Sequence, residues 1–193
     1  MNKKEIIDNI SASYSLLTEE CKADLYSSSK ILYFDKNTLL VTENQYANKS
    51  YYIISGCSRA YYLKDGKDIS DWFAFEGDFI TSIQSFFAGI PSPHYIEVPE
   101  DSILLEITRE SAEALSQKHH DFERLTKIIA VKTMLQQQER IVSMQFQTAE
   151  QKYQNILALR PNITQRVPLT HIASYIGITL ETLSRIRKSQ SRI

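Results

Sequence analysis

The sequence predicts an α+β protein in which short antiparallel strands come first, a long helix follows and a helix-turn-helix closes the chain. Three observations predict this order. Apolar residues recur with a period of two across residues 30–108, as in half-buried strands. Residues 122–146 then contain neither glycine nor proline and return to helical spacing. Finally, residues 169–188 hold two short helical patterns separated by Gly177.

The first segment, residues 5–28, has helical spacing. Ile6, Ile7 and Ile10 share one face of a first helix. Thr18 stands before two acidic residues, a pattern typical of the start of a second helix, although Cys21 three positions later does not complete a capping box.

Residues 30–108 predict an antiparallel barrel, roll or sandwich. Short apolar segments follow one another at intervals of roughly 8–12 residues, with turn residues between them. Asp65-Gly66 is the strongest hairpin signal. The expected strands are residues 31–33, 39–41, 51–54, 58–63, 69–75, 95–98 and 102–107.

The long helix predicted over residues 122–146 follows a short helix at residues 111–116. At about 35 Å it is too long to be covered by a small barrel. Its apolar stripe, interrupted by Lys132 and Glu139, would pair with the same helix of a second copy in a two-fold dimer. The alternative is that the helix folds back onto the barrel.

A further helix is expected over residues 148–159. Thr148 and Gln151 form the pattern of a capping box at its start. The apolar residues that we expect to point inward are Tyr153, Ile156, Leu157 and Leu159. Residues 165–167 are expected to be a short extended connector.

Residues 169–188 have the pattern of a helix-turn-helix. Ile172 and Ile176 are the buried pair of the first helix, Gly177 provides a sharp turn, and Thr179 can cap the second helix. Small Ala173 allows the two helices to cross closely. The second helix is expected to bury Leu183 and Ile186, with Leu180 as a third, and to expose Glu181, Thr182, Ser184, Arg185 and Lys188. Such a face suits a DNA major groove, whereas the alternative is an αα-hairpin in a helical core.

The charge distribution favours binding to phosphate through the C-terminal segment. Net charge is −1, but residues 160–193 carry six basic residues and one acidic residue. The rest of the chain has 16 basic and 22 acidic residues. A basic module on an acidic body is typical of a protein that binds nucleic acid with one end, although a solvated charged tail has the same composition.

Several classes of protein are disfavoured by composition. The N-terminus lacks the apolar core of a signal peptide and no apolar run nears ~18 residues, so we expect a cytoplasmic protein with no membrane partner. Cys21 and Cys57 are far apart and form no CxxC motif, which argues against an iron–sulfur cluster, a structural zinc site or a disulfide framework. We therefore expect neither cofactor nor metal, and no catalytic residues.

The order of roll, long helix and helix-turn-helix resembles the Crp/Fnr family of bacterial transcription regulators, over nearly the whole chain. The segments that carry this resemblance are residues 53–59, 72–79, 100–107 and 172–186. FAFEGDF followed by SFFAGIPS is similar to the branch common in Bacteroidetes. The resemblance implies a cyclic-nucleotide-binding-like β-roll sensor over residues 1–120, a dimerisation helix over residues 121–146 and a DNA-binding domain over residues 147–193.

The resemblance also implies roles on the second helix of the motif, residues 179–188. Glu181 and Arg185 match family positions that contact bases, and chemistry agrees because Arg185 can bond guanine and Glu181 can accept from cytosine. Glu181 could also orient Arg185 across one helical turn. Leu180 stands where many members have a basic residue, which alters the expected half-site. The expected phosphate contacts are Thr170, Thr179, Thr182 and Lys188.

The family's cyclic-nucleotide cassette is only partly present. Gly77 matches, Asp78 shortens the family's glutamate, and Ser92 stands at the arginine position. Residues 68–106 contain eight acidic residues and no Lys or Arg, so His94 is the only cation in this window. Because a buried phosphate needs a paired cation, we expect a less anionic ligand, or none, in a pocket formed by these four residues.

Three functions follow from the sequence. The first is a homodimeric regulator that binds double-stranded DNA at a two-fold symmetric site. RNA polymerase and an unidentified small-molecule effector are possible additional partners. A cyclic-nucleotide-responsive regulator is the second. The third is an enzyme on a cupin-like barrel, which is disfavoured because its metal ligands would have to come from four scattered histidines. The family's β-wing is expected to be absent or truncated, because five residues follow Lys188.

Overall fold

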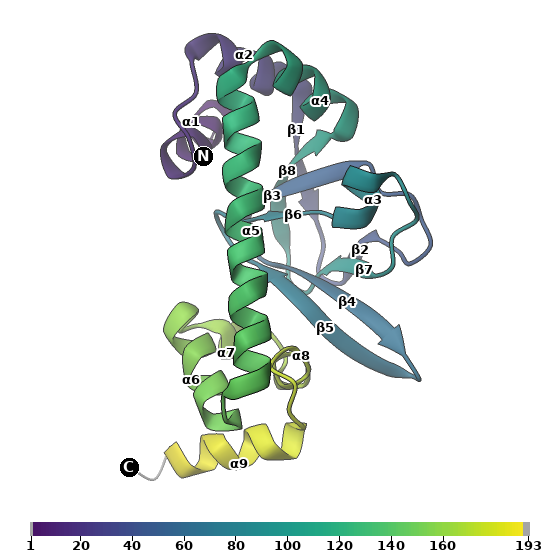
Figure 1. The fold of residues 1–193 in the computed structure, drawn as a ribbon, viewed down its shortest axis with the longest axis vertical. Helices are drawn as coiled ribbons and strands as arrows, with labels where there is room; N and C mark the ends of the chain where they lie inside the picture. Colours follow the sequence, from purple (N-terminus) through teal and green to yellow (C-terminus); the bar gives the residue numbers. More distant parts are fainter. Residues whose placement is uncertain (1, 191–193) are drawn as a thin grey trace. The chain divides into compact units, whose positions relative to one another are not determined.

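The strands pair into two four-stranded sheets in the computed structural model, which describes residues 2–190 (Figure 1). One sheet has the order β1-β8-β3-β6 and the other the order β2-β7-β4-β5. The strands are β1 (Ser29–Phe34), β2 (Thr38–Val41), β3 (Lys49–Ser55), β4 (Ser58–Lys64), β5 (Lys67–Ala74), β6 (Phe79–Ile80), β7 (Tyr95–Val98) and β8 (Ser102–Thr108). The predicted antiparallel arrangement is confirmed, with β8 between β1 and β3.

The turns between strands lie where the sequence predicts them. Asp65 and Gly66 both have positive φ, 52° and 72°, as the tight hairpin between β4 and β5 requires. Asn37 and Asn44 also adopt left-handed conformations. These turns fix the register that places alternate side chains inside the roll.

Helices cover the first sheet on one side and bury its main core. They are α1 (Lys3–Ser13), α2 (Glu19–Ser28) and α4 (Arg109–Lys118), whereas α3 (Ile83–Ala88) lies between β6 and β7 in the chain. Ile6 and Ile10 of α1, Leu25 of α2 and Leu115 of α4 join Leu105 of β8 in one apolar cluster. Thr18 caps α2 as predicted, since its hydroxyl accepts a hydrogen bond from the Cys21 N–H at 3.3 Å.

The long helix is present as α5 (His120–Phe146), a single helix of 27 residues and about 40 Å. Phe122 and Leu125 are buried in the core that contains α1 and α2. Farther along, large apolar side chains are exposed: Val131, Met134, Leu135, Ile141, Val142, Met144 and Phe146. Among the described residues, no helix is long and apolar enough to cross a membrane.

The chain divides into two compact units that both include part of α5. The first comprises residues up to Arg59 together with Phe73–Thr133, and the second comprises Ala60–Trp72 together with residues from Met134 onward. The outer part of the β4–β5 hairpin therefore belongs with the C-terminal helices. Those helices are α6 (Ala149–Leu159), α7 (Ile163–Arg166), α8 (Leu169–Tyr175) and α9 (Leu180–Gln190).

Three local predictions were wrong or incomplete. Residues 165–167 were expected to be extended, but α7 covers most of them because Ile163 is buried and anchors one helical turn. Leu159 was expected to point inward, but it is 71% exposed at the C-terminal end of α6. Helix α3 and the two-residue strand β6 were not predicted, since both are too short to show a period.

Candidate nucleic-acid interface

Helices α8 and α9 meet at a sharp turn centred on Gly177. Its φ of +68° is the left-handed conformation that glycine adopts without strain. A Cβ at this position would lie only 2.5 Å from Met144 Cε, so a larger residue would also displace the Met144 side chain. The Ile178 N–H then bonds the Ala173 carbonyl at 3.0 Å, and Thr179 Oγ1 accepts from the Thr182 N–H at 3.2 Å, which starts α9.

The buried side of this helix pair agrees with the sequence pattern at most positions. Ile172 and Ile176 of α8 and Leu183 of α9 are buried. Leu183 anchors α9, which contacts both α8 and α6. The prediction that Leu180 is buried was wrong: it is 38% exposed, because it stands in the first turn of α9 and faces outward.

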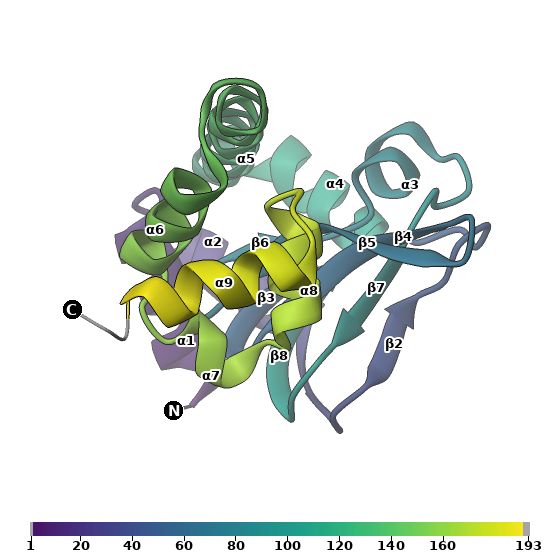
Figure 2. The same cartoon turned by 90° about the horizontal axis from the view of Figure 1, so that it is seen from below.

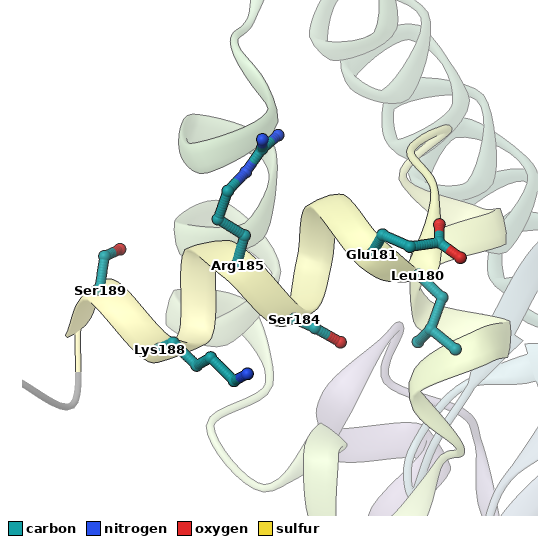
Figure 3. Close-up of a pocket in the computed structure, with 6 residues that line it drawn as sticks. All are labelled: Leu180, Glu181, Ser184, Arg185, Lys188 and Ser189. Atoms are coloured by element: carbon teal, nitrogen blue, oxygen red, sulfur yellow. The ribbon is translucent and has the colours of Figure 1, made fainter.

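The outward side of α9 forms an open hollow. Six residues line it: Leu180, Glu181, Ser184, Arg185, Lys188 and Ser189 (Figure 3). In Figure 2 the helix lies on the viewer's side of α6, α7 and α8, which share its unit. The structure thus brings together Glu181, Arg185 and Lys188 as predicted, and adds Ser189, whose short polar side chain gave no signal in the sequence.

Glu181 and Arg185 do not act as a pair in this structure. Figure 3 shows their side chains pointing apart, and no ion pair between them occurs among the described residues. The pKa of Glu181 is lowered by a hydrogen bond from its own backbone N–H and by the Thr179 hydroxyl. The expectation that Glu181 orients Arg185 is therefore not met, because the carboxylate is held at the start of the helix.

Three of the four predicted phosphate contacts lie at the start of α8 or α9, and the fourth lies near the end of α9. Thr170 is exposed in the first turn of α8. The hydroxyls of Thr179 and Thr182 are 3.2 Å apart at the start of α9, and Lys188 is exposed in its last turns. Residues 191–193 lie outside the described residues, so the expectation that the family's β-wing is absent or truncated stays a prediction.

Within the same unit, the outer part of the β4–β5 hairpin holds α8 in place. The Ser174 hydroxyl donates to the Asp68 carbonyl at 3.0 Å and accepts from the Ser70 N–H at 2.9 Å. Arg140 of α5 lies 3.1 Å from the Asp71 carboxylate and stacks over the Tyr175 ring at 5.0 Å. These contacts fix α8 against α5 and β5, and thereby support the open face of α9.

Hydrogen bonds within the first unit hold the four residues of the predicted effector pocket. Gly77 donates its N–H to the Ile53 carbonyl at 3.0 Å, and the Asp78 carboxylate accepts from the Phe75 N–H at 3.2 Å. In contrast, Ser92 Oγ accepts from Ser82 at 2.8 Å and donates to the His94 carbonyl at 2.7 Å. Ser92 and His94 are buried.

The prediction that His94 is the only nearby cation was wrong, because the fold brings in cations from distant parts of the chain. Lys132 of α5 lies 3.3 Å from the Asp78 carboxylate and also contacts the Tyr14 hydroxyl at 3.3 Å. Arg59 of β4 is 2% exposed and lies 2.8 Å from the Glu97 carboxylate of β7. Both cations already have an acidic partner within the first unit.

Comparison with known proteins agrees with this architecture. Residues 31–119 match the family model of the cyclic nucleotide-binding domain. This segment belongs to the cyclic nucleotide-binding domain family. No curated protein matches the chain by sequence.

Solved structures extend the likeness beyond that segment. FixK2 from Bradyrhizobium japonicum has a TM-score of 0.73 at 19% identity, covering 85% of each chain. A regulator assigned to the Crp/Fnr family from Eubacterium rectale has a TM-score of 0.70 at 18% identity, covering 91% of this chain and 85% of that one. The c-di-GMP-responsive regulator CLP of Xanthomonas campestris reaches 0.68 at 16% identity, covering 91% and 92%. The chain thus shares the fold of Crp/Fnr-type regulators.

Proposed function

We propose that the protein is a homodimeric transcriptional regulator of the Crp/Fnr type, which binds a two-fold symmetric DNA site through α9. The observation that carries this proposal is the open face of α9. Arg185, Lys188 and Ser184 line that face, while Leu183 on the other side is buried against the unit. A helix held by its apolar side and exposing donors on the other is suited to the major groove.

The exposed side of α5 supports the dimer. At 3.6 residues per turn, Val131, Leu135 and Val142 fall on one face, and Phe146, 77% exposed, lies near it. Arg140 and Met144 fall on the opposite face, where they contact Tyr175 and Gly177. Because one side of the helix is already occupied, the exposed apolar side is the one available to a second copy.

In this proposal each predicted domain has its own role. Residues 1–120 form the sensor roll, residues 121–146 the dimerisation helix and residues 147–193 the DNA-binding domain. In this scheme RNA polymerase is a further partner at the promoter, the protein acts in the cytoplasm, and no catalytic step is involved. The roll binds an uncharged or weakly anionic effector, or serves as a structural module.

A cyclic-nucleotide-responsive regulator is the second candidate, because residues 31–119 match the cyclic nucleotide-binding domain family. The residues at the positions that bind the nucleotide phosphate in the family favour this candidate less. Asp78 replaces the longer glutamate, Ser92 replaces the phosphate-binding arginine, and Arg59 is already paired with Glu97. Calorimetry with cyclic AMP and cyclic GMP separates the two candidates, since micromolar binding of either nucleotide would establish the second.

DNA binding is tested by titrating a fluorescent duplex, selected from a random pool, at several salt concentrations. The logarithm of the affinity should fall linearly with the logarithm of salt concentration, because phosphate contacts release counterions. Arg185→Ala should weaken binding by about 5- to 160-fold, the effect expected for a lost base contact of ~1–3 kcal/mol. Arg187→Ala removes the same charge from another side of α9 and should have a smaller effect. Equal effects of the two variants, or affinity independent of salt, would contradict the proposal.

A further inference from the structure

Three potential metal ligands meet at the junction of α2 with the start of α5. Cys21 lies in the first turn of α2, His119 is the single residue between α4 and α5, and Asp121 is in the first turn of α5. One ligand atom from each residue lies within 4.8 Å of the other two. Cys21 is fully buried, His119 is 7% exposed and Asp121 is half-buried, so the cluster lies inside the first unit rather than on its surface.

The carboxylate of Asp121 is fixed by its neighbours. Its Oδ2 accepts from the Thr18 N–H at 2.6 Å and its Oδ1 accepts from the Phe122 N–H at 3.1 Å. Each carboxylate oxygen offers about two lone pairs, so these bonds leave capacity for a cation. Thr18 is also the cap of α2, whose third residue is Cys21. The same turn therefore positions both the oxygen and the sulfur.

His119 is oriented as metal-binding histidines usually are. Its Nε2 lies 2.7 Å from Asp24 Oδ2, and this carboxylate also contacts Lys118 Nζ at 2.6 Å. A ligating histidine commonly bonds a carboxylate through the ring nitrogen that does not bind the metal, which fixes the ring and increases its basicity. This contact leaves Nδ1 as the ligand atom.

We propose that Cys21 Sγ, His119 Nδ1 and an Asp121 oxygen bind one zinc ion, with water as the fourth ligand. Sulfur, nitrogen and oxygen donors together suit the borderline-soft character of Zn²⁺. Bonds of ~2.0–2.3 Å place tetrahedral ligands roughly 3.3–3.8 Å apart, so side-chain shifts of about 1 Å close the site. On binding, the Cys21 thiol transfers its proton to the solvent and ligates as thiolate.

The neighbouring acidic set is a weaker candidate. Glu20, Asp24 and His119 also bring ligand atoms within 4.8 Å of one another, but Glu20 is exposed and the set has no thiol. Lys118 already contacts both carboxylates, at 3.2 Å and 2.6 Å. In the proposed site Asp24 therefore contacts His119 Nε2, which orients the ring, and does not bind the metal.

The proposal does not depend on DNA binding. If zinc binds here, the stability of the α2–α5 junction within the first unit depends on the metal. A bound zinc would crosslink α2 to the residues from which α5 starts, and zinc removal would leave a hydrogen-bonded but uncrosslinked junction. The sequence did not indicate this site because Cys21 is far in the chain from His119 and Asp121, and a single His-x-Asp pair is not a metal-binding motif.

The test uses the metal-free full-length protein titrated with Co²⁺, a spectroscopic substitute for zinc, and with Zn²⁺ in competition. One equivalent of Co²⁺ should give a thiolate-to-metal charge-transfer band in the near ultraviolet, and one equivalent of Zn²⁺ should abolish it. Cys21→Ser should lose the band, whereas Cys57→Ser, which changes the other buried free cysteine, should keep it.

Asp121→Asn provides a second, milder variant. The amide oxygen can still accept from the Thr18 N–H, which keeps the residue that caps α2 in place, but the bond from the Phe122 N–H and the ligand charge are lost. Zn²⁺ affinity in competition should fall at least tenfold, and far-ultraviolet circular dichroism should match that of the wild type. The proposal is overturned if the wild type gives no charge-transfer band, if the band survives Cys21→Ser, or if folded Asp121→Asn binds zinc as tightly as the wild type.

Discussion

Arg140 of α5 and Asp71 of β5 form an ion pair, with Arg140 Nη1 3.1 Å from Asp71 Oδ1. The same guanidinium lies 3.4 Å from the Ser70 carbonyl and 3.5 Å from the Tyr175 carbonyl. One side chain therefore connects the long helix, the outer hairpin and the last residue of α8. We infer that the orientation of α8, and with it the position of α9, depends on this contact.

Replacing Arg140 with Met should loosen α8 while keeping most of the side-chain volume. Both partners are mostly shielded from solvent, so the lost charged hydrogen bonds should cost about 1–2 kcal/mol. Hydrogen exchange measured by mass spectrometry should show faster exchange in α8 and in the outer hairpin. Arg124→Met is the matched control, because Arg124 is on the same helix but bonds Ser15 and the Leu16 carbonyl. Unchanged exchange in α8 of Arg140→Met would refute the role of this contact.

A charge on the exposed apolar face of α5 should prevent dimer formation. Val142→Glu places a carboxylate in the middle of the proposed interface, where it would lose hydration on association. Light scattering coupled to size-exclusion chromatography should show the wild type as a dimer and the variant as a monomer at the same micromolar concentration. Gln136→Glu adds the same charge to another exposed side of the helix and should leave the dimer intact. A wild-type monomer, or a dimeric Val142→Glu variant, would contradict this interface.

The buried Arg59–Glu97 pair should matter more for stability than any surface pair. Glu97→Gln leaves the 2%-exposed guanidinium of Arg59 without this counter-charge, which typically costs about 3–5 kcal/mol. In urea denaturation, the free energy of unfolding should therefore fall strongly for Glu97→Gln. It should be partly restored in the double variant Arg59→Met, Glu97→Leu. Lys22→Met, at an exposed contact with Asp8, should leave the midpoint close to that of the wild type. A Glu97→Gln midpoint equal to the wild type would show that the pair contributes little.

Acid should weaken the start of α9 through Glu181. Because its backbone N–H and Thr179 lower the pKa of this carboxyl below its usual 4.5, the charged form stabilises the folded helix. This contribution is present above pH 4.5 and is lost as the pH falls through the lowered pKa. NMR titration of the Glu181 side-chain carbon should give a midpoint below 4.5, and Glu181→Gln should remove the associated shift of the Thr182 amide. A midpoint at or above 4.5 would contradict the capping role.

The elements that the sequence predicted are those with a periodic apolar pattern over many residues or with a strong local turn or capping signal. The apolar spacing of α5, the positive-φ turn at Asp65-Gly66 and the Thr148 capping box all depend on a few neighbouring residues, and the structure confirms each. Gly177 was identified for the same reason, since a sharp turn between helices needs its conformation.

The wrong prediction about cations near the effector pocket concerns partners from distant segments, whereas the other wrong predictions are local. Nothing near Asp78 in the sequence indicates Lys132, and nothing near Glu97 indicates Arg59. Leu180 is apolar, yet the first turn of α9 places it outward. The residues predicted on the open face of α9 depend only on helical spacing, which explains why the sequence could group them.

The most direct test of a dimer that binds DNA through two copies of α9 is selection of bound duplexes from a random-sequence pool by the wild-type protein. A two-fold dimer should select an inverted repeat whose half-sites are centred about one helical turn, or a multiple of it, apart (~10 bp per turn). Val142→Glu, which should be monomeric, should lose the repeat and select at most a single half-site. Selection of a motif without two-fold symmetry, or no enrichment at all, would contradict dimeric DNA binding through α9.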